Sequence, residues 1–81
     1  MLFRSVRFTK SARKHRIGKR HVLFVIKNYE PQYFQKDEQV QIFWIAKDDR
    51  GLELEIVAIE AGEHLIVIHV MPTSYRRRNR K

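Results

Sequence analysis

The chain has 81 residues, which is the size of one small domain, and we expect a single domain over positions 1–81. Seventeen Lys and Arg against nine Asp and Glu give a formal net charge of +8 at pH 7, and 43% of the residues are hydrophobic. This apolar fraction excludes a wholly disordered basic tail. Because the chain has no cysteine, a disulfide scaffold, a Cys-containing zinc finger and a thiol nucleophile are excluded as well.

The charge is polarised along the chain. Residues 1–20 hold eight basic residues and no acid, all nine acids lie between Glu30 and Glu63, and residues 76–81 add five more positive charges. Two basic ends around an acidic middle favour a polyanionic partner, nucleic acid first and an anionic membrane surface second. The alternative is a solvated surface that keeps a small domain soluble.

No segment of the sequence predicts a signal peptide or a membrane span. Arg4 and Arg7 interrupt the apolar residues near the start, so no signal core forms there. The apolar run Val22–Ile26 is far shorter than the roughly 20 residues that a membrane helix needs. We therefore expect a cytoplasmic protein without a membrane partner.

Leu2–Phe8 is predicted to form an edge strand, in which Arg4 and Arg7 interrupt the apolar residues. Thr9 or Ser11 can then cap a short, very basic helix over Lys10–Arg16, which Gly18 ends. This element carries half of the eight basic residues in positions 1–20.

Lys19–Asn28 contains the run Val22–Ile26, whose local pattern suits a buried strand as well as a helix. We predict a helix, partly because of the family resemblance described below. It ends where Pro31 forces Glu30 out of the helical conformation.

The remainder of the chain is predicted to be β. Four strands are expected, at Gln32–Gln35, Val40–Ala46, Leu52–Ile59 and His64–Met71. Gly51 occupies the left-handed position of the turn between the second and third of these strands. Two consecutive hairpins predict an antiparallel meander, and with the preceding strand and one or two short helices packed on it they predict an α+β fold. Residues 76–81 are predicted to form a basic tail that is mobile when unbound.

His69 is the leading candidate for chemistry, because histidine titrates near neutrality. Counting by twos along the strand places it on the face of Leu65, Val67 and Met71 and opposite to His64. The two histidines would then be unable to hold a metal jointly. A histidine at the edge of the core, bonded to the backbone, is the alternative interpretation.

The segment that follows this strand holds Tyr75 and Arg76. Tyrosine can donate or accept a proton, and the arginine fork grips phosphate oxygens. RNA cleavage without a metal needs acid–base groups and cations of this kind. A base must take the proton of the attacking 2′-hydroxyl, and an acid must protonate the leaving oxygen. Cations must stabilise the charged transition state. We therefore nominate His69 and Tyr75 as the acid–base pair and Arg76 as a phosphate ligand, with no metal and no cofactor.

The basic stretch near the N-terminus gives a second group of candidates. Lys14 and His15 are nominated for catalysis, and a generic phosphate-binding face explains them equally well. The nominated RNA-binding residues are Arg13, Arg16, Lys19, Arg20, Arg77 and Arg78.

Two further sets of residues allow two interpretations each. Glu53 and Glu55 share one strand face, where they either serve as a general base or pair with the basic helix, and the second role is favoured. Trp44, Phe43 and Tyr33 can stack on bases, although packing in the core is the commoner fate of aromatic residues in strands.

Three segments are similar to a known family. Phe8–His15 matches an early strand-to-helix segment that ends in Lys-His, Ile42–Met71 matches a three-strand region with turns at Gly51 and Gly62, and Thr73–Arg78 matches a basic C-terminal stretch. Together they resemble the BrnT-like toxins of type II toxin–antitoxin systems, within the RelE/ParE-like superfamily.

This resemblance implies a RelE-like fold and a toxin that inhibits translation by cleaving RNA, free or on the ribosome, with a cognate antitoxin as partner. The family tends to carry basic residues along the last strand, where this chain has His64, Ile66 and Met71. The role of those arginines therefore does not transfer. The chain is then a member of a sibling family, an inactive relative, or a nuclease that uses His69 in place of the strand arginines. A non-catalytic nucleic-acid-binding protein and a ParE-like topoisomerase inhibitor are the two alternatives.

Overall fold

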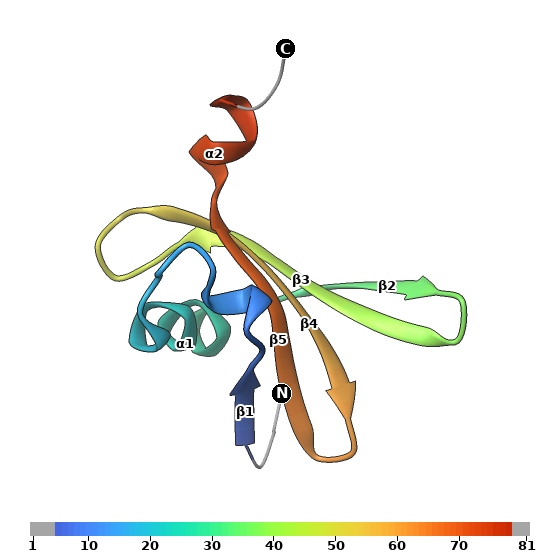
Figure 1. Ribbon diagram of the computed structural model, residues 1–81. Coiled ribbons are helices and arrows are strands. Elements are labelled where there is room, and N and C mark those ends of the chain that lie inside the picture. The colour runs from blue at the N-terminus through green and yellow to red at the C-terminus, as the bar shows by residue number, and fades with distance from the viewer. Residues whose placement is uncertain (1–4, 79–81) are drawn as a thin grey trace.

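The computed structural model describes residues 5–78 and arranges them as a small α+β fold, as the sequence predicts (Figure 1). The elements are β1 (Ser5–Phe8), the 3-10 helix η1 (Ser11–Arg13), α1 (Lys19–Asn28), β2 (Gln32–Lys36), β3 (Gln39–Lys47), β4 (Glu53–Ala61), β5 (His64–Pro72) and α2 (Thr73–Arg78). Among the described residues, no helix has the length and apolar character needed to cross a bilayer.

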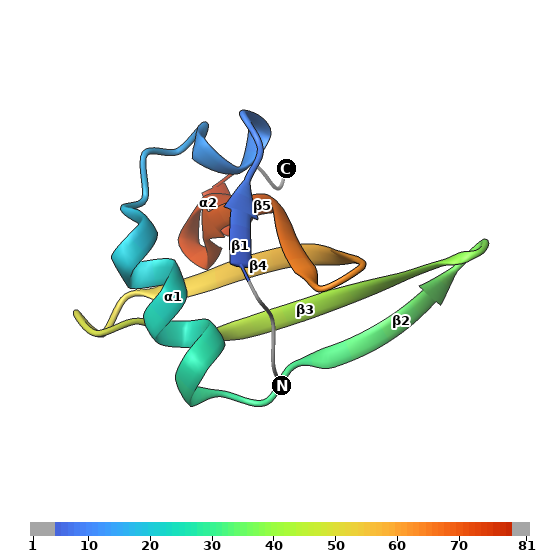
Figure 2. The same ribbon diagram turned by 90° about the horizontal axis from the view of Figure 1, so that it is seen from below.

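The five strands form one sheet in the order β1-β5-β4-β3-β2. Strands β2 to β5 are the predicted antiparallel meander, while the edge strand β1 pairs parallel to β5, with Ser5 opposite His64. At the other edge, β2 and β3 project away from α1 as a long arm (Figure 2).

Alternation along the strands gives the sheet two unlike faces. The inner face packs against α1 and η1, and its core is built from fully buried side chains such as Trp44, Ile56 and Leu65 together with Val22 and Val25 of α1. Burying each of these large apolar side chains contributes roughly 1.5–3 kcal/mol. The opposite face, which we call the outer face, has the odd-numbered residues of β3 and β4 and is free of α1.

The segment Val22–Ile26 is helical, as predicted, and the alternative prediction of a strand is wrong. The predicted basic helix at Lys10–Arg16 is shorter than expected, because only the η1 turn forms and Arg16 adopts a left-handed φ of 59°. Thr9 does act at its start, since the Thr9 hydroxyl accepts a hydrogen bond from the Ala12 amide at 3.2 Å.

Strand β5 contains a β-bulge that overturns the predicted placement of His69. Ala58 pairs with Val67 but Val57 pairs with His69, so Ile68 is an extra residue in the ladder. The insertion reverses the alternation beyond it. His69 therefore lies on the outer face, and it shares that face with His64 rather than with the buried Val67.

The chain after β5 is helical, and the helix includes residues 76–78 of the predicted basic tail. Pro72 ends the strand, and α2 follows at once and extends to Arg78. Figure 1 shows α2 standing at the end of the sheet, away from α1. Positions 79–81 of the expected tail lie outside the described residues.

Candidate functional site

The outer face has a polar cluster at the end of the sheet where β4, β5 and α2 meet. Glu55 of β4 is only 4% exposed. Its Oε2 lies 3.1 Å from Nε2 of His69, and both of its oxygens accept hydrogen bonds from Arg76, at 2.6 to 3.0 Å. We call these three residues the Glu55 site.

The Glu55 site places a buried anion beneath two groups that solvent can reach. The side chains of His69 and Arg76 are 35% and 64% exposed, against 5% for that of Glu55. The hydrogen bonds from Arg76 to Glu55 raise the pKa of the guanidinium, so it remains a cation at any physiological pH. A ligand approaching from solvent therefore meets an imidazole and a guanidinium that a carboxylate holds in place.

The geometry also fixes how His69 can act. An ionised carboxylate only accepts hydrogen bonds, so the bond to Glu55 assigns the imidazole proton to Nε2. In neutral His69, Nδ1 is then the basic nitrogen. This is the arrangement in which a carboxylate orients a histidine for proton transfer.

Tyr75 and His15 bring the two basic ends of the chain together. Their rings meet edge to face, with centroids 5.1 Å apart and an interplanar angle of 83°. Tyr75 precedes Arg76 on α2, and His15 follows η1, so the N-terminal basic segment reaches the helix that supplies the guanidinium of the Glu55 site. The sequence predicted these residues as candidates but gave no sign that their rings touch.

The other nominated residues fall into three groups. Arg13, Lys14 and Arg16 are exposed on and after η1. Lys19 and Arg20 begin α1, on the other side of the sheet from the Glu55 site, and Lys19 Nζ lies 5.4 Å from the centre of the Phe8 ring. Arg77 and Arg78 continue α2 after Arg76. The structure thus brings His69 and Arg76 together and separates them from the basic start of α1.

Glu55 is the residue of this site that the sequence placed differently. Glu53 and Glu55 of β4 were expected to pair with the basic helix near the N-terminus, but they contact α2 instead: Glu55 binds Arg76, and Glu53 accepts a hydrogen bond from Thr73 at 2.7 Å. The available signal was the position of Glu55 between Leu54 and Ile56, inside an apolar strand.

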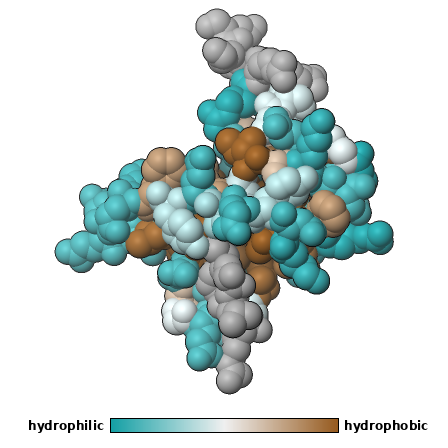
Figure 3. Space-filling view, turned by 180° about the vertical axis from the view of Figure 1, so that it is seen from behind, coloured by the Kyte–Doolittle hydropathy of each residue, from teal (hydrophilic) through white to brown (hydrophobic). Residues whose placement is uncertain are grey.

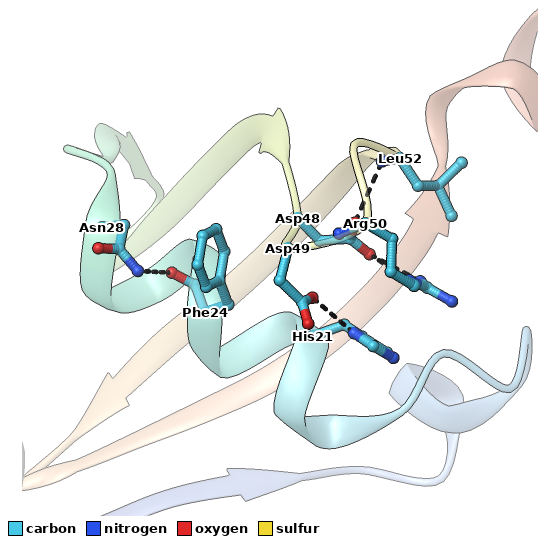
Figure 4. A network of polar contacts seen from close by, with 7 residues as sticks. All are labelled: His21, Phe24, Asn28, Asp48, Asp49, Arg50 and Leu52. Carbon is cyan, nitrogen blue, oxygen red and sulfur yellow. Dashed lines mark hydrogen bonds and ion pairs between the residues drawn. The ribbon is translucent and has the colours of Figure 1, made fainter.

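A second polar cluster joins the β3–β4 turn to the start of α1 (Figure 4). Nδ1 of His21 lies 2.6 Å from Oδ1 of Asp49, and the buried Asp48 binds the Arg50 side chain and accepts hydrogen bonds from the Arg50 and Leu52 amides. Gly51, with φ at 85°, provides the left-handed residue that was predicted for this turn.

Donor atoms of His21, Asp48 and Asp49 all lie within 4.8 Å of one another, which is a spacing that metal ligands can have. Both oxygens of Asp48 are, however, already engaged by Arg50 and Leu52, and the imidazole of His21 meets Asp49 directly. These contacts account for the cluster, because they hold the β3–β4 turn against the start of α1.

Replacing Asp48 by asparagine is expected to destabilise the fold by about 2 kcal/mol at pH 7, since a buried charged acceptor is lost. Burial by itself would raise the pKa of Asp48, but the hydrogen bonds from Arg50 and Leu52 outweigh it and hold the pKa below its ordinary value of 3.8. The carboxylate therefore stabilises the fold above about pH 4, and this contribution is lost as the pH falls through the folded-state pKa.

Urea unfolding of both chains between pH 2 and pH 7 measures this effect, with Glu60→Gln, an exposed change on β4, as control. The free-energy difference between the wild type and Asp48→Asn should shrink at low pH. A difference that is independent of pH would contradict the assignment.

No protein-family model, curated protein or solved structure matches this chain.

Proposed function

We propose that this protein is an endoribonuclease that acts without a metal, as the toxin of a type II toxin–antitoxin system. The observation that supports the nuclease activity best is the Glu55 site, in which a buried carboxylate orients an accessible histidine and an accessible arginine on an open sheet face. The net charge of +8 suits a polyanionic substrate. The contact between His15 and Tyr75 brings the N-terminal basic segment to α2.

The proposed reaction is an internal phosphoryl transfer. Nδ1 of His69 takes the proton of a ribose 2′-hydroxyl, the 2′-oxygen attacks the adjacent phosphorus, and the bond from phosphorus to the 5′-oxygen breaks. The leaving oxygen receives a proton from the pair formed by His15 and Tyr75, so the products are a 2′,3′-cyclic phosphate and a 5′-hydroxyl. Arg76 stabilises the charge that builds on the phosphate oxygens.

The assignment as a toxin of a type II toxin–antitoxin system rests on the family resemblance in the sequence. Cleavage of messenger RNA in the cytoplasm, free or on the ribosome, would stop translation, and a cognate antitoxin would neutralise the protein. Lys14, Arg16 and Arg13 would guide the phosphate backbone toward Arg76, because they flank His15, whose ring contacts Tyr75.

Purified protein is expected to cut single-stranded RNA in buffer containing EDTA, leaving cyclic phosphate ends. His69→Ala should reduce the rate by about 10²–10⁴-fold, which is the usual contribution of a positioned acid–base group. His64→Ala is the matched control, because His64 lies on the same strand and face but is bonded to Ser5. Induced expression of the wild type, but not of His69→Ala, should arrest growth.

Equal cleavage by the wild type and His69→Ala would overturn the catalytic assignment. Salt-sensitive RNA binding with no cleavage, in the presence and absence of ribosomes, would select the non-catalytic alternative. Recovery of a topoisomerase rather than RNA would select the inhibitor.

A further inference from the structure

An exposed apolar patch continues from the Glu55 site across the outer face. It consists of Phe34 on β2 and Phe43 and Ile45 on β3, with Phe34 50% and Ile45 58% exposed. The Phe34 and Phe43 rings meet edge to face with centroids 5.1 Å apart. Figure 3 shows hydrophobic groups reaching the surface of the arm formed by β2 and β3 among largely hydrophilic neighbours. We call these three residues the outer patch.

The pairing register connects the outer patch to the catalytic candidates. His69 pairs with Val57, and Val57 pairs with Phe43, so the three residues lie in one row across the sheet. In the next row, Ile45 pairs with Glu55 itself. Neighbouring strands are about 4.8 Å apart, which places Phe43 about 10 Å from His69 across the sheet. A nucleotide adjoining a phosphate held at His69 can span that gap.

The polar surroundings of the outer patch suit a nucleic acid. Alternation puts Lys36 and Gln41 on the same face as Phe34, where an ammonium can meet a phosphate and an amide can meet a base edge. Glu55, which pairs with Ile45 of the patch, is already bound by Arg76. A flat aromatic surface bordered by amides and cations therefore adjoins the proposed cleavage site.

We infer that the outer patch is a stacking platform for unpaired nucleobases next to the phosphate bound at the Glu55 site. Aromatic side chains on an open sheet face stack on bases of single strands, whereas paired bases in a duplex have their faces covered. The inference rests on the proposed function for what happens to the phosphate, but base stacking does not require cleavage. The substrate class is thus single-stranded RNA that lies across β3 and β2.

The test is binding of the wild-type chain to a fluorescent octamer of 2′-O-methyl RNA, which lacks the attacking hydroxyl. Phe34→Ala should weaken binding about 5- to 150-fold, the effect expected for one lost stacked base. Tyr33→Ala is the matched control: Tyr33 is the neighbouring residue on the same strand, is 55% exposed and lies on the opposite face. It should bind as the wild type does.

Two further probes separate stacking from charge. An abasic octamer with the same number of phosphates and a duplex of the same length should both bind the wild type weakly, and Phe34→Ala should not weaken them further. Equal affinity of Phe34→Ala and Tyr33→Ala for the octamer would overturn the platform. So would a wild-type dimer that Phe34→Ala disperses while octamer binding stays unchanged, because the patch would then contact a second copy. Loss of cleavage with intact, Phe34-dependent binding would refute only the nuclease.

Discussion

Glu55→Gln is expected to lower the rate of RNA cleavage by at least about 100-fold while the chain stays folded. The substitution keeps the shape of the side chain but removes its charge. An amide offers one acceptor oxygen where the carboxylate offers two, so it cannot hold Arg76 and His69 as the native side chain does. The imidazole then loses the partner that assigns its proton to Nε2.

The effect on stability should be much smaller than the effect on rate. Arg76 is largely exposed, so water can solvate it after Glu55 is neutralised, and the free energy of unfolding should change by about 1 kcal/mol. Single-turnover cleavage and urea unfolding give the two values. Glu53→Gln, two residues away on the same face, is the control and should cleave normally. A variant Glu55→Gln that cleaves at the wild-type rate would show that the carboxylate does not position His69.

Trp44→Ala is expected to unfold the protein or to bring it close to unfolding at 25 °C. Trp44 is 1% exposed and lies at the centre of the inner face, where its Nε1 donates a hydrogen bond to the carbonyl of Tyr29 at 3.1 Å. Truncating a buried tryptophan costs about 3–5 kcal/mol. A domain of this size has a total stability toward the low end of about 5–15 kcal/mol, so little remains.

The neighbouring Ile45 provides the control for Trp44. It follows Trp44 on β3 but points to the outer face and is 58% exposed, so Ile45→Ala should change stability by less than about 0.5 kcal/mol. Trp44→Phe should fall between the two, since it keeps most of the packing but leaves the Tyr29 carbonyl without its donor. Thermal unfolding followed by circular dichroism measures all three. A cooperative transition of Trp44→Ala at the wild-type temperature would contradict the described core.

Much of this fold follows from short-range patterns in the sequence. Alternation along β3 separates Ile42 and Trp44 from Phe43 and Ile45, and in the structure the first pair is the buried one. The stop at Pro31 and the turn at Gly51 depend on local backbone constraints that each residue type imposes. The parallel pairing of β1 has no such local signal, because it joins segments that are far apart in the chain.

The candidate site is less predictable, because it depends on an irregularity. Counting by twos gives the wrong face for His69, since the bulge at Ile68 shifts the alternation by one residue. The burial of Glu55 depends in turn on Arg76, which reaches back over the strand from α2 across 21 residues of sequence. Neither the bulge nor the contact between Glu55 and Arg76 can be predicted from residue propensities or from the alternation of apolar residues. The sequence therefore nominates His69 and Arg76 without showing the carboxylate that joins them.

The pairing of β1 with β5 also means that the sheet closes late in the synthesis of the chain. Ser5 leaves the ribosome 59 residues before its partner His64, and His69 and Arg76 emerge later still. Until then the first strand has no neighbour to pair with, and such long-range closure is slow compared with forming hairpins. A nascent chain therefore holds neither a closed sheet nor a complete Glu55 site, and under the proposed function it could not yet cleave the message from which it is being translated.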